Sequence, residues 1–141
     1  MEISEKSRSV LAEGGWYTGR REATASIESS LESRGYRVSD VVCRFLAEFG
    51  QLAFATDDDE DWHFDPVLAI KHTVHGNVMK DSERAGVEIC PVGEASRGHL
   101  LLTMDPRGRM FASYDDVLGI VGESPIEAIE SLCEGRPLKP F

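Results

Sequence analysis

One stretch, SDVVCRFLAEFG (39–50), most constrains the fold, because it predicts a helix with both ends marked. Ser39 is a natural N-cap, since its side-chain oxygen can accept a hydrogen bond from a backbone N–H of the first turn. The apolar residues recur at i, i+3, i+4 and i+7 and are Val42, Phe45, Leu46 and Phe49. Gly50 is expected to end the helix in left-handed backbone. A helix with one such stripe needs a core in which to bury it.

Four further segments carry helical patterns, and glycines follow them. They are Ile3 to Glu13, Glu22 to Arg34, Asn77 to Ala85, and the segment after Ser124. The last has the clearest start, with Ser124 as N-cap, Pro125 at the first helical position and Glu127 three residues after the cap. Gly135 is expected to end it.

The second half of the chain is typical of a sheet. The segment GHLLLTMDPRGRMFASY (98–114) predicts a β-hairpin, because apolar residues alternate before the turn chemistry of Asp105 to Gly108. Strands are also predicted at QLAFAT (51–56) and VEICPVG (87–93). HFDPVLAI (63–70) is interpreted as a strand that Pro66 interrupts, which favours an edge or a bend.

These elements predict one α+β domain over residues 1–141, with a mostly antiparallel central sheet and flanking helices. Residues 1–9 are a candidate flexible end. The length of 141 residues suffices for one compact core. No apolar run approaches the ~18 residues of a membrane span, and the N-terminus lacks the apolar core of a signal peptide. Three widely spaced cysteines, Cys43, Cys90 and Cys133, favour free thiols in a reducing compartment, so we expect a cytoplasmic protein.

The charge balance bears on partners. The chain has 25 acidic and 15 basic residues, a formal net charge of −10. Such a protein repels nucleic acid and anionic membrane, and we expect neither as a partner. It can attract a basic protein.

The acids concentrate in FATDDDEDWHFDP (54–66), where five acids precede a tryptophan. One interpretation is a solvated loop. The other is a docking surface, with the acids as an electrostatic rim and the tryptophan as an anchor or a core plug. The candidate partner-binding residues are Asp57, Asp58, Asp59, Glu60, Asp61 and Trp62.

The sequence offers little support for an enzyme. The chain has no GxSxG elbow and no GxxxxGK phosphate loop. His72 and His75 form an HxxH pair without an evident third ligand, and the acidic run lacks the DxDxDG calcium pattern. Trp16 between glycines, ahead of Arg20, fits core packing better than a recognition patch. We therefore expect no catalytic residue, no metal and no cofactor.

Several motifs in order carry a family resemblance. They are GGWYTGR (14–20), CRFLAEFGQL (43–52), FDP (64–66), CPVG (90–93), LLLTMDPRGRMF (100–111) and LGIVGESPIEAIESLCEG (118–135). This order resembles the SUKH superfamily of bacterial proteins, specifically its third immunity-protein subfamily. The chain departs from the pattern at Gln51, where the family tends to have a second glycine.

The resemblance implies a non-catalytic α+β immunity protein of a polymorphic toxin system. Such a protein neutralises a cognate toxin domain in the cytoplasm, and the toxins paired with the superfamily are often nucleases or nucleic-acid deaminases. The alternative is a SUKH-type adaptor or regulatory interaction module with no toxin partner. Oligomeric state does not follow from the sequence.

Overall fold

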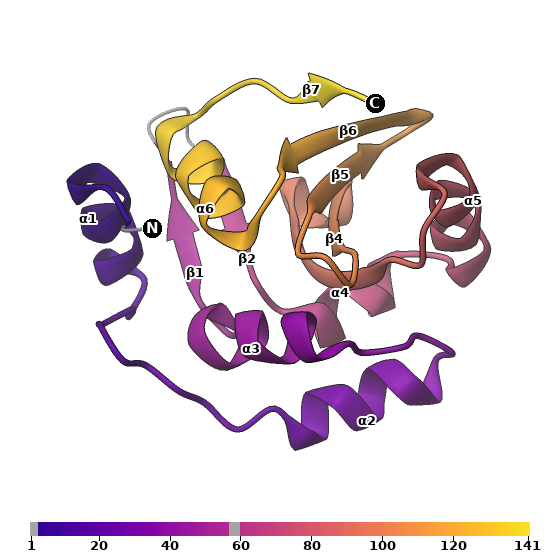
Figure 1. Cartoon of the computed structure of the whole chain (residues 1–141), viewed down its shortest axis with the longest axis horizontal. Helices are drawn as coiled ribbons and strands as arrows, with labels where there is room; N and C mark the ends of the chain where they lie inside the picture. Colours follow the sequence, from indigo (N-terminus) through magenta and orange to yellow (C-terminus); the bar gives the residue numbers. More distant parts are fainter. Residues whose placement is uncertain (1–2, 57–59) are drawn as a thin grey trace.

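The computed structural model describes residues 3–56 and 60–141. Within these residues the chain forms six α-helices and one seven-stranded sheet (Figure 1). The helices are α1 (Glu5–Glu13), α2 (Ala25–Ser33), α3 (Asp40–Phe49), α4 (Pro66–His72), α5 (His75–Ala85) and α6 (Pro125–Glu134). The strands are β1 (Ala53–Ala55), β2 (Asp61–His63), β3 (Cys90–Ala95), β4 (Leu100–Met104), β5 (Met110–Tyr114), β6 (Val117–Gly122) and β7 (Lys139–Pro140). A 3₁₀ turn, η1 (Ser96–Gly98), joins β3 to β4.

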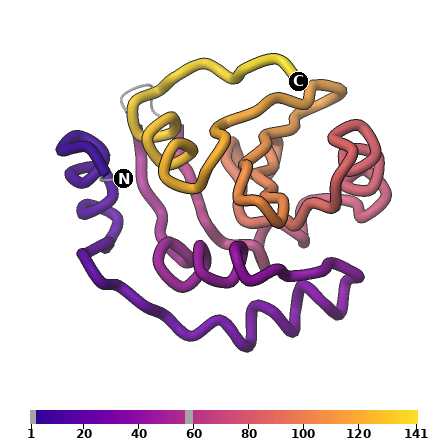
Figure 2. The backbone as a smooth tube through the Cα atoms, viewed as in Figure 1, coloured from indigo at the N-terminus to yellow at the C-terminus, as the bar shows by residue number. Residues whose placement is uncertain are grey.

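The sheet is antiparallel throughout, and its order follows the chain from β1 to β7. The helices pack around it: α4 contacts β3, α6 contacts β6, and α1 packs on the outside of α6 (Figure 1). Figure 2 shows α1 and α2 on the outside of the molecule and α3 nearer to the sheet, while the C-terminal segment crosses the opposite side. The predicted α+β class is confirmed.

The core is richest in aromatic side chains where α3 meets the start of the sheet. The ring of Phe45 lies 5.3 Å from that of Phe49 and 5.2 Å from that of Phe64, and Phe54 lies 5.4 Å from Phe64. Trp16 stacks on Phe49 at 6.4 Å, and its Nε1 donates to a carboxylate oxygen of Glu48 at 3.2 Å. The apolar stripe on α3 is therefore buried, as its spacing predicts, and Trp16 is a core residue.

Five helix ends have the caps that local sequence chemistry favours. The side chains of Ser4, Ser39 and Ser124 each accept a hydrogen bond from the backbone N–H three residues later. Gly86 and Gly135 end α5 and α6 in left-handed backbone, with φ of 73° and 68°. Local sequence chemistry thus defines these ends without help from the core.

The prediction for residues 63–70 is wrong. Pro66 does not interrupt a strand; it begins α4, and Asp65 caps that helix by accepting a hydrogen bond from Leu68 N at 3.1 Å. Proline is favourable at the first helical position, because its missing N–H has no partner there and its φ is already helical. The same Asp–Pro pair that suggested an edge strand is therefore a helix start.

Gly50 is also not the left-handed residue after α3. Its φ and ψ are −59° and 146°, and Gln51 takes the positive φ of 68° instead. Gly50 is required for space, since a Cβ there would lie 2.3 Å from Leu46 O. The departure from the family pattern at Gln51 thus falls on the residue that bears the unusual backbone.

Several strand and helix limits differ from the prediction. β2, β6 and β7 were not predicted, and the strand expected at residues 87–93 runs from Cys90 to Ala95. The helix expected from Glu22 begins only at Ala25, because Glu22 N donates to Ala47 O at 2.7 Å and ties this segment to α3. Such tertiary hydrogen bonds have no local pattern in the sequence.

Candidate partner-binding surface

The topology places three connections at one end of the sheet. Because each strand runs antiparallel to the next, the links β1–β2, β3–β4 and β5–β6 belong to one end of the sheet, and the β4–β5 link belongs to the other end. We call the first three links the hairpin end. It comprises Glu60–Asp61, Ser96–His99 and Asp115–Asp116 among the described residues.

The opposite end is covered by helices. A Cβ at Gly108, in the β4–β5 turn, would lie 2.8 Å from Pro125 Cδ and 3.2 Å from Val41 Cγ1. The first turns of α6 and α3 therefore pack against the β4–β5 turn. α4 also approaches the hairpin end, since a Cβ at Gly98 would lie 2.7 Å from His72 Cβ, but most of the described residues of the hairpin end are exposed.

The described part of the predicted acidic segment lies at the hairpin end. Glu60 and Asp61 lead into β2, where Asp61 pairs opposite Ala55 and is exposed. Glu60 Oε1 accepts a hydrogen bond from Ser96 Oγ at 2.5 Å, which joins the first hairpin to the second. Asp57, Asp58 and Asp59 lie outside the described residues.

Trp62 sits on the core side of this segment. It pairs opposite Phe54 in β1 and Ala95 in β3, which are 6% and 0% exposed. Residues directly opposite one another share a sheet face, and Trp62 packs half-buried against the core cluster. Its Nε1 is buried and has no hydrogen-bond partner within residues 3–56 and 60–141. This position favours the core-plug alternative for the indole; its role as an anchor stays a prediction.

The structure also shows a feature that sequence reasoning missed. The tip of the β5–β6 hairpin reads YDDV (114–117), again acids beside an aromatic residue, but here the ring is 41% exposed. Val117, the cross-strand partner of Tyr114, is 44% exposed. The motif is present in the sequence, but β6 was not predicted, so these residues were not recognised as the tip of a hairpin.

The backbone at the hairpin end is unusual. Four non-glycine residues in the described structure have positive φ, and three of them lie here: Ser96, Arg97 and Asp115. Such conformations cost energy, and they persist where the surroundings fix them. The loops of the hairpin end are therefore shaped by the fold.

A cleft opens between α5 and the β5–β6 hairpin, with a volume of about 640 Å³. Its walls come from the end of α4, from α5, from the β3–β4 link and from the β5–β6 tip. The lining includes His72, Val74, Lys80, Asp81, Arg84, His99, Leu101, Tyr114, Asp115 and Asp116. Arg84 spans one wall, because its Nη1 donates to Asp116 O at 3.0 Å.

A second cleft of about 640 Å³ lies at the start of α3. Its charged residues are Arg37, Arg44, Asp40 and Glu88, two of each sign. This balance makes it a poorer match for a basic partner than the acidic hairpin end.

The sequence matches the SUKH-3 immunity protein family over residues 3–135. The chain belongs to the SUKH-3 immunity protein family. The family is one of non-catalytic immunity proteins and implies a cognate toxin as the partner. Searches of curated proteins and of solved structures found no match.

The histidines of this SUKH-3 chain do not form the HxxH pair that their spacing suggests. His72 ends α4, and its Nδ1 lies 2.8 Å from an oxygen of buried Glu94; His75 begins α5 and its ring lies 5.0 Å from that of Tyr36. Across the described parts of the chain, no three histidine, cysteine or acidic side chains gather as a metal site would require. Each histidine instead has a structural neighbour.

The three cysteines are free thiols. Burial raises the pKa of Cys90 and of Cys133 to about 12, and burial followed by a hydrogen bond with Glu28 raises the pKa of Cys43 to about 11. Since the thiolate is the reactive form, all three are poor nucleophiles at neutral pH. They are packing residues.

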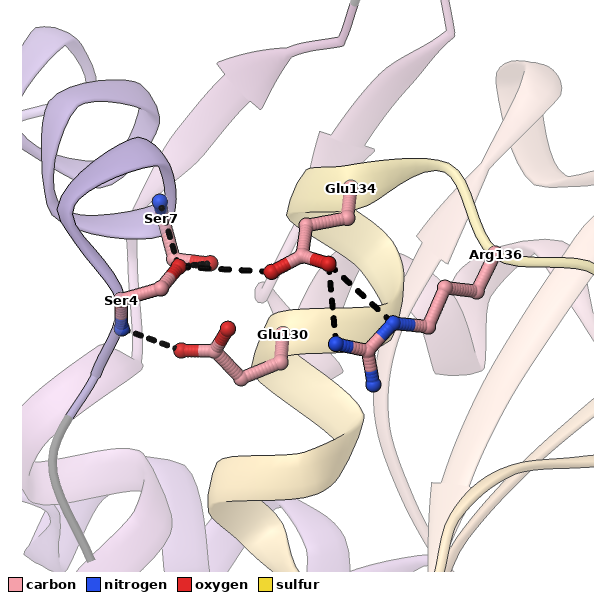
Figure 3. A network of polar contacts seen from close by, with 5 residues as sticks. All are labelled: Ser4, Ser7, Glu130, Glu134 and Arg136. Atoms are coloured by element: carbon pink, nitrogen blue, oxygen red, sulfur yellow. Dashed lines mark hydrogen bonds and ion pairs between the residues drawn. The ribbon is translucent and has the colours of Figure 1, made fainter.

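A polar network fixes α1 to α6 (Figure 3). Ser4 N donates to Glu130 Oε1 at 2.6 Å, and Ser4 Oγ to Glu134 Oε2 at 3.4 Å. Arg136 binds the other oxygen of Glu134 at 2.9 and 3.2 Å, which lowers the pKa of that carboxyl. These groups satisfy one another, so the network is structural.

None of the helices in the described residues is long and apolar enough to cross a membrane; α5, the longest, has 11 residues.

Proposed function

We propose that this SUKH-3 chain neutralises a basic cognate toxin domain in the cytoplasm by binding it at the hairpin end, through the segment Asp57 to Trp62. The observation that supports this most is the placement of the acidic segment. Asp61 is exposed on β2 and Glu60 leads into the same strand, at the hairpin end of the sheet. The formal net charge of −10 adds a long-range attraction for a basic partner.

The physical consequence concerns association. Acids on a free surface steer a basic protein toward it and raise the association rate, and this effect weakens with salt. Toxins that act on nucleic acids, such as nucleases or deaminases, need basic sites to hold phosphates. An acidic protein seated over such a site excludes the substrate by occupying its charges.

The test compares two variants with the same net charge. In the first, Asp57, Asp58, Asp59, Glu60 and Asp61 are changed to Asn or Gln. In the second, five exposed glutamates elsewhere are changed to Gln: Glu13, Glu22, Glu32, Glu88 and Glu123. Toxin affinity and protection of growing cells are measured at low and high salt.

We expect the first variant to lose affinity and most of its salt dependence, because it removes the local attraction. The second should change affinity only through the smaller long-range term. Equal effects of the two variants would show that the segment has no special role. If the cognate toxin domain is acidic, the proposal is wrong.

A further inference from the structure

The β5–β6 tip combines features of a protein contact site. Tyr114 and Val117 expose 41% and 44% of their surface, and Val74, at the start of α5, exposes 65%. Tyr114 and Val74 line the same cleft of about 640 Å³. Exposed apolar side chains grouped around a hollow mark interaction surfaces more often than scattered ones do.

Acidic groups lie beside these apolar ones. Asp115 and Asp116 are exposed at the tip, and Asp81 faces the cleft from α5. Arg84 is engaged within the wall, since it lies 3.9 Å from Asp81 and donates to Asp116 O. Lys80 is therefore the group on the α5 wall whose positive charge repels a basic partner.

The tip is also held in position. Asp115 takes a left-handed backbone with φ of 49°, and Arg84 ties the following residue to α5. A fixed loop loses little freedom on binding, so more of the contact energy appears as affinity.

We propose that this cleft seats a segment of the cognate toxin domain, with an apolar side chain between Tyr114 and Val74 and a neighbouring Lys or Arg against Asp115 and Asp116. The inference rests on the proposed function for its partner, but it uses a different surface from the segment Asp57 to Trp62. The apolar contact anchors the complex and slows dissociation, whereas the acids speed association. Tyr114 thus gives the complex an exposed apolar anchor, whereas Trp62 is half-buried against the core.

The test uses a catalytically inactivated recombinant toxin domain that the wild-type chain neutralises in a killing assay. Rates of association and dissociation are measured for Tyr114→Ser and for Tyr17→Ser. Tyr17 is the matched control, because it is 59% exposed on the loop between α1 and α2. We expect Tyr114→Ser to weaken binding by at least about 30-fold, mainly through faster dissociation, as hot-spot truncations do. Tyr17→Ser should leave binding within about twofold, as contacts outside a hot spot do.

A variant that is expected to bind faster is also needed, because misfolding can explain a loss of binding but not a gain. Lys80→Glu removes the opposing charge, and we expect association at low salt to become about threefold faster. Asp115→Asn with Asp116→Asn should slow association by a similar factor and reduce its salt dependence. Asparagine tolerates the left-handed backbone at 115, so the tip keeps its shape.

The outcomes distinguish this inference from the proposed function. If Tyr114→Ser binds like Tyr17→Ser while loss of the acids at 57–61 still weakens binding, the cleft is not the anchor and the proposed function stands. If Lys80→Glu slows association, the assigned charge of the occupant is wrong. If the acids at 57–61 have no role but Tyr114→Ser fails to bind, the cleft alone carries recognition. If no toxin binds the wild-type chain, both proposals fail.

Discussion

At the scale of single residues, Gln51 shows how one side chain can store strain without affecting the fold. Its φ of 68° is a conformation that glycine adopts freely and that costs other residues about 1–2 kcal/mol. Its backbone is held there because Gln51 N donates to Phe64 O at 2.9 Å. The turn between α3 and β1 is therefore made by tertiary contact and not by the local residue.

Replacing this residue with glycine should stabilise the protein. For Gln51→Gly we expect a gain of about 0.5–1 kcal/mol, which is the relieved strain less the extra entropy of the unfolded chain. Urea unfolding measures it. Gln51→Ala keeps the strain and is the control; a glycine variant no more stable than the alanine variant would show that position 51 is unstrained.

Arg20 closes the end of α3. Its guanidinium is 8% exposed and donates to Glu48 O at 2.6 Å and to Gly50 O at 2.8 Å. For Arg20→Met we expect a loss of about 2–3 kcal/mol, because two carbonyl oxygens lose their donors. Its exposed neighbour supplies the control: Arg21→Met should change stability by less than about 0.5 kcal/mol. Equal losses in the two variants would show that Arg20 contributes only general charge.

The buried thiols predict a dependence of stability on alkaline pH. Burial raises the pKa of Cys90 in the folded protein from 9.0 to about 12. The stability that this thiol contributes is therefore fully present below pH 9 and is lost as the pH rises toward 12. Each pH unit above 9 should cost about 1.4 kcal/mol for this thiol. Chemical unfolding at pH 8 and pH 10 measures the loss, and Cys90→Ala should lose correspondingly less. The same loss in both proteins would assign it to other groups.

At the scale of elements, α1 depends on α6 for its position. Its start is tied to Glu130 by the 2.6 Å hydrogen bond from Ser4 N, and its residues Ser7 and Leu11 are 0% exposed. For Glu130→Ala we expect a loss of about 1–2 kcal/mol and faster amide exchange across α1. Glu130→Gln keeps an acceptor and should retain most of the protection. Unchanged exchange in the alanine variant would mean that apolar packing alone holds α1.

Sequence predicts those elements whose ends have their own chemistry. Ser39 and Ser124 cap helices because a hydroxyl beside three free N–H groups needs no tertiary help. The β4–β5 hairpin is equally local, since Asp105 accepts hydrogen bonds from Arg107 N and Arg109 N within its own turn. The family's motifs fall on these same segments, which is why the resemblance follows from the sequence.

Elements made by tertiary pairing were not predictable. β2 has three residues and β7 two, too few to show an alternating pattern. The Asp–Pro pair at 65–66 is compatible with a bend or a helix start, and only the packing of α4 on β3 decides. For the candidate surface the sequence supplies the acids at 57–61, but the exposed tip at Tyr114 required the strand order.

At the scale of the whole molecule, the two ends of the sheet differ in how exposed their links are. The first turns of α3 and α6 pack against the β4–β5 turn. At the other end, α4 and α5 contact two of the three hairpin links, but most of the described link residues are exposed. In the part of the chain that the structure describes, acids, exposed apolar side chains and shaped loops coincide at the hairpin end. That region is where we expect the cognate toxin domain to bind.

The most direct test of this account is amide hydrogen exchange of the full chain, free and in complex with its cognate toxin domain. We predict protection at residues 60–63, 74–84 and 111–118, with α2 and α3 unchanged. Protection confined to α2 and α3, with the hairpin end exchanging as in the free protein, would contradict it.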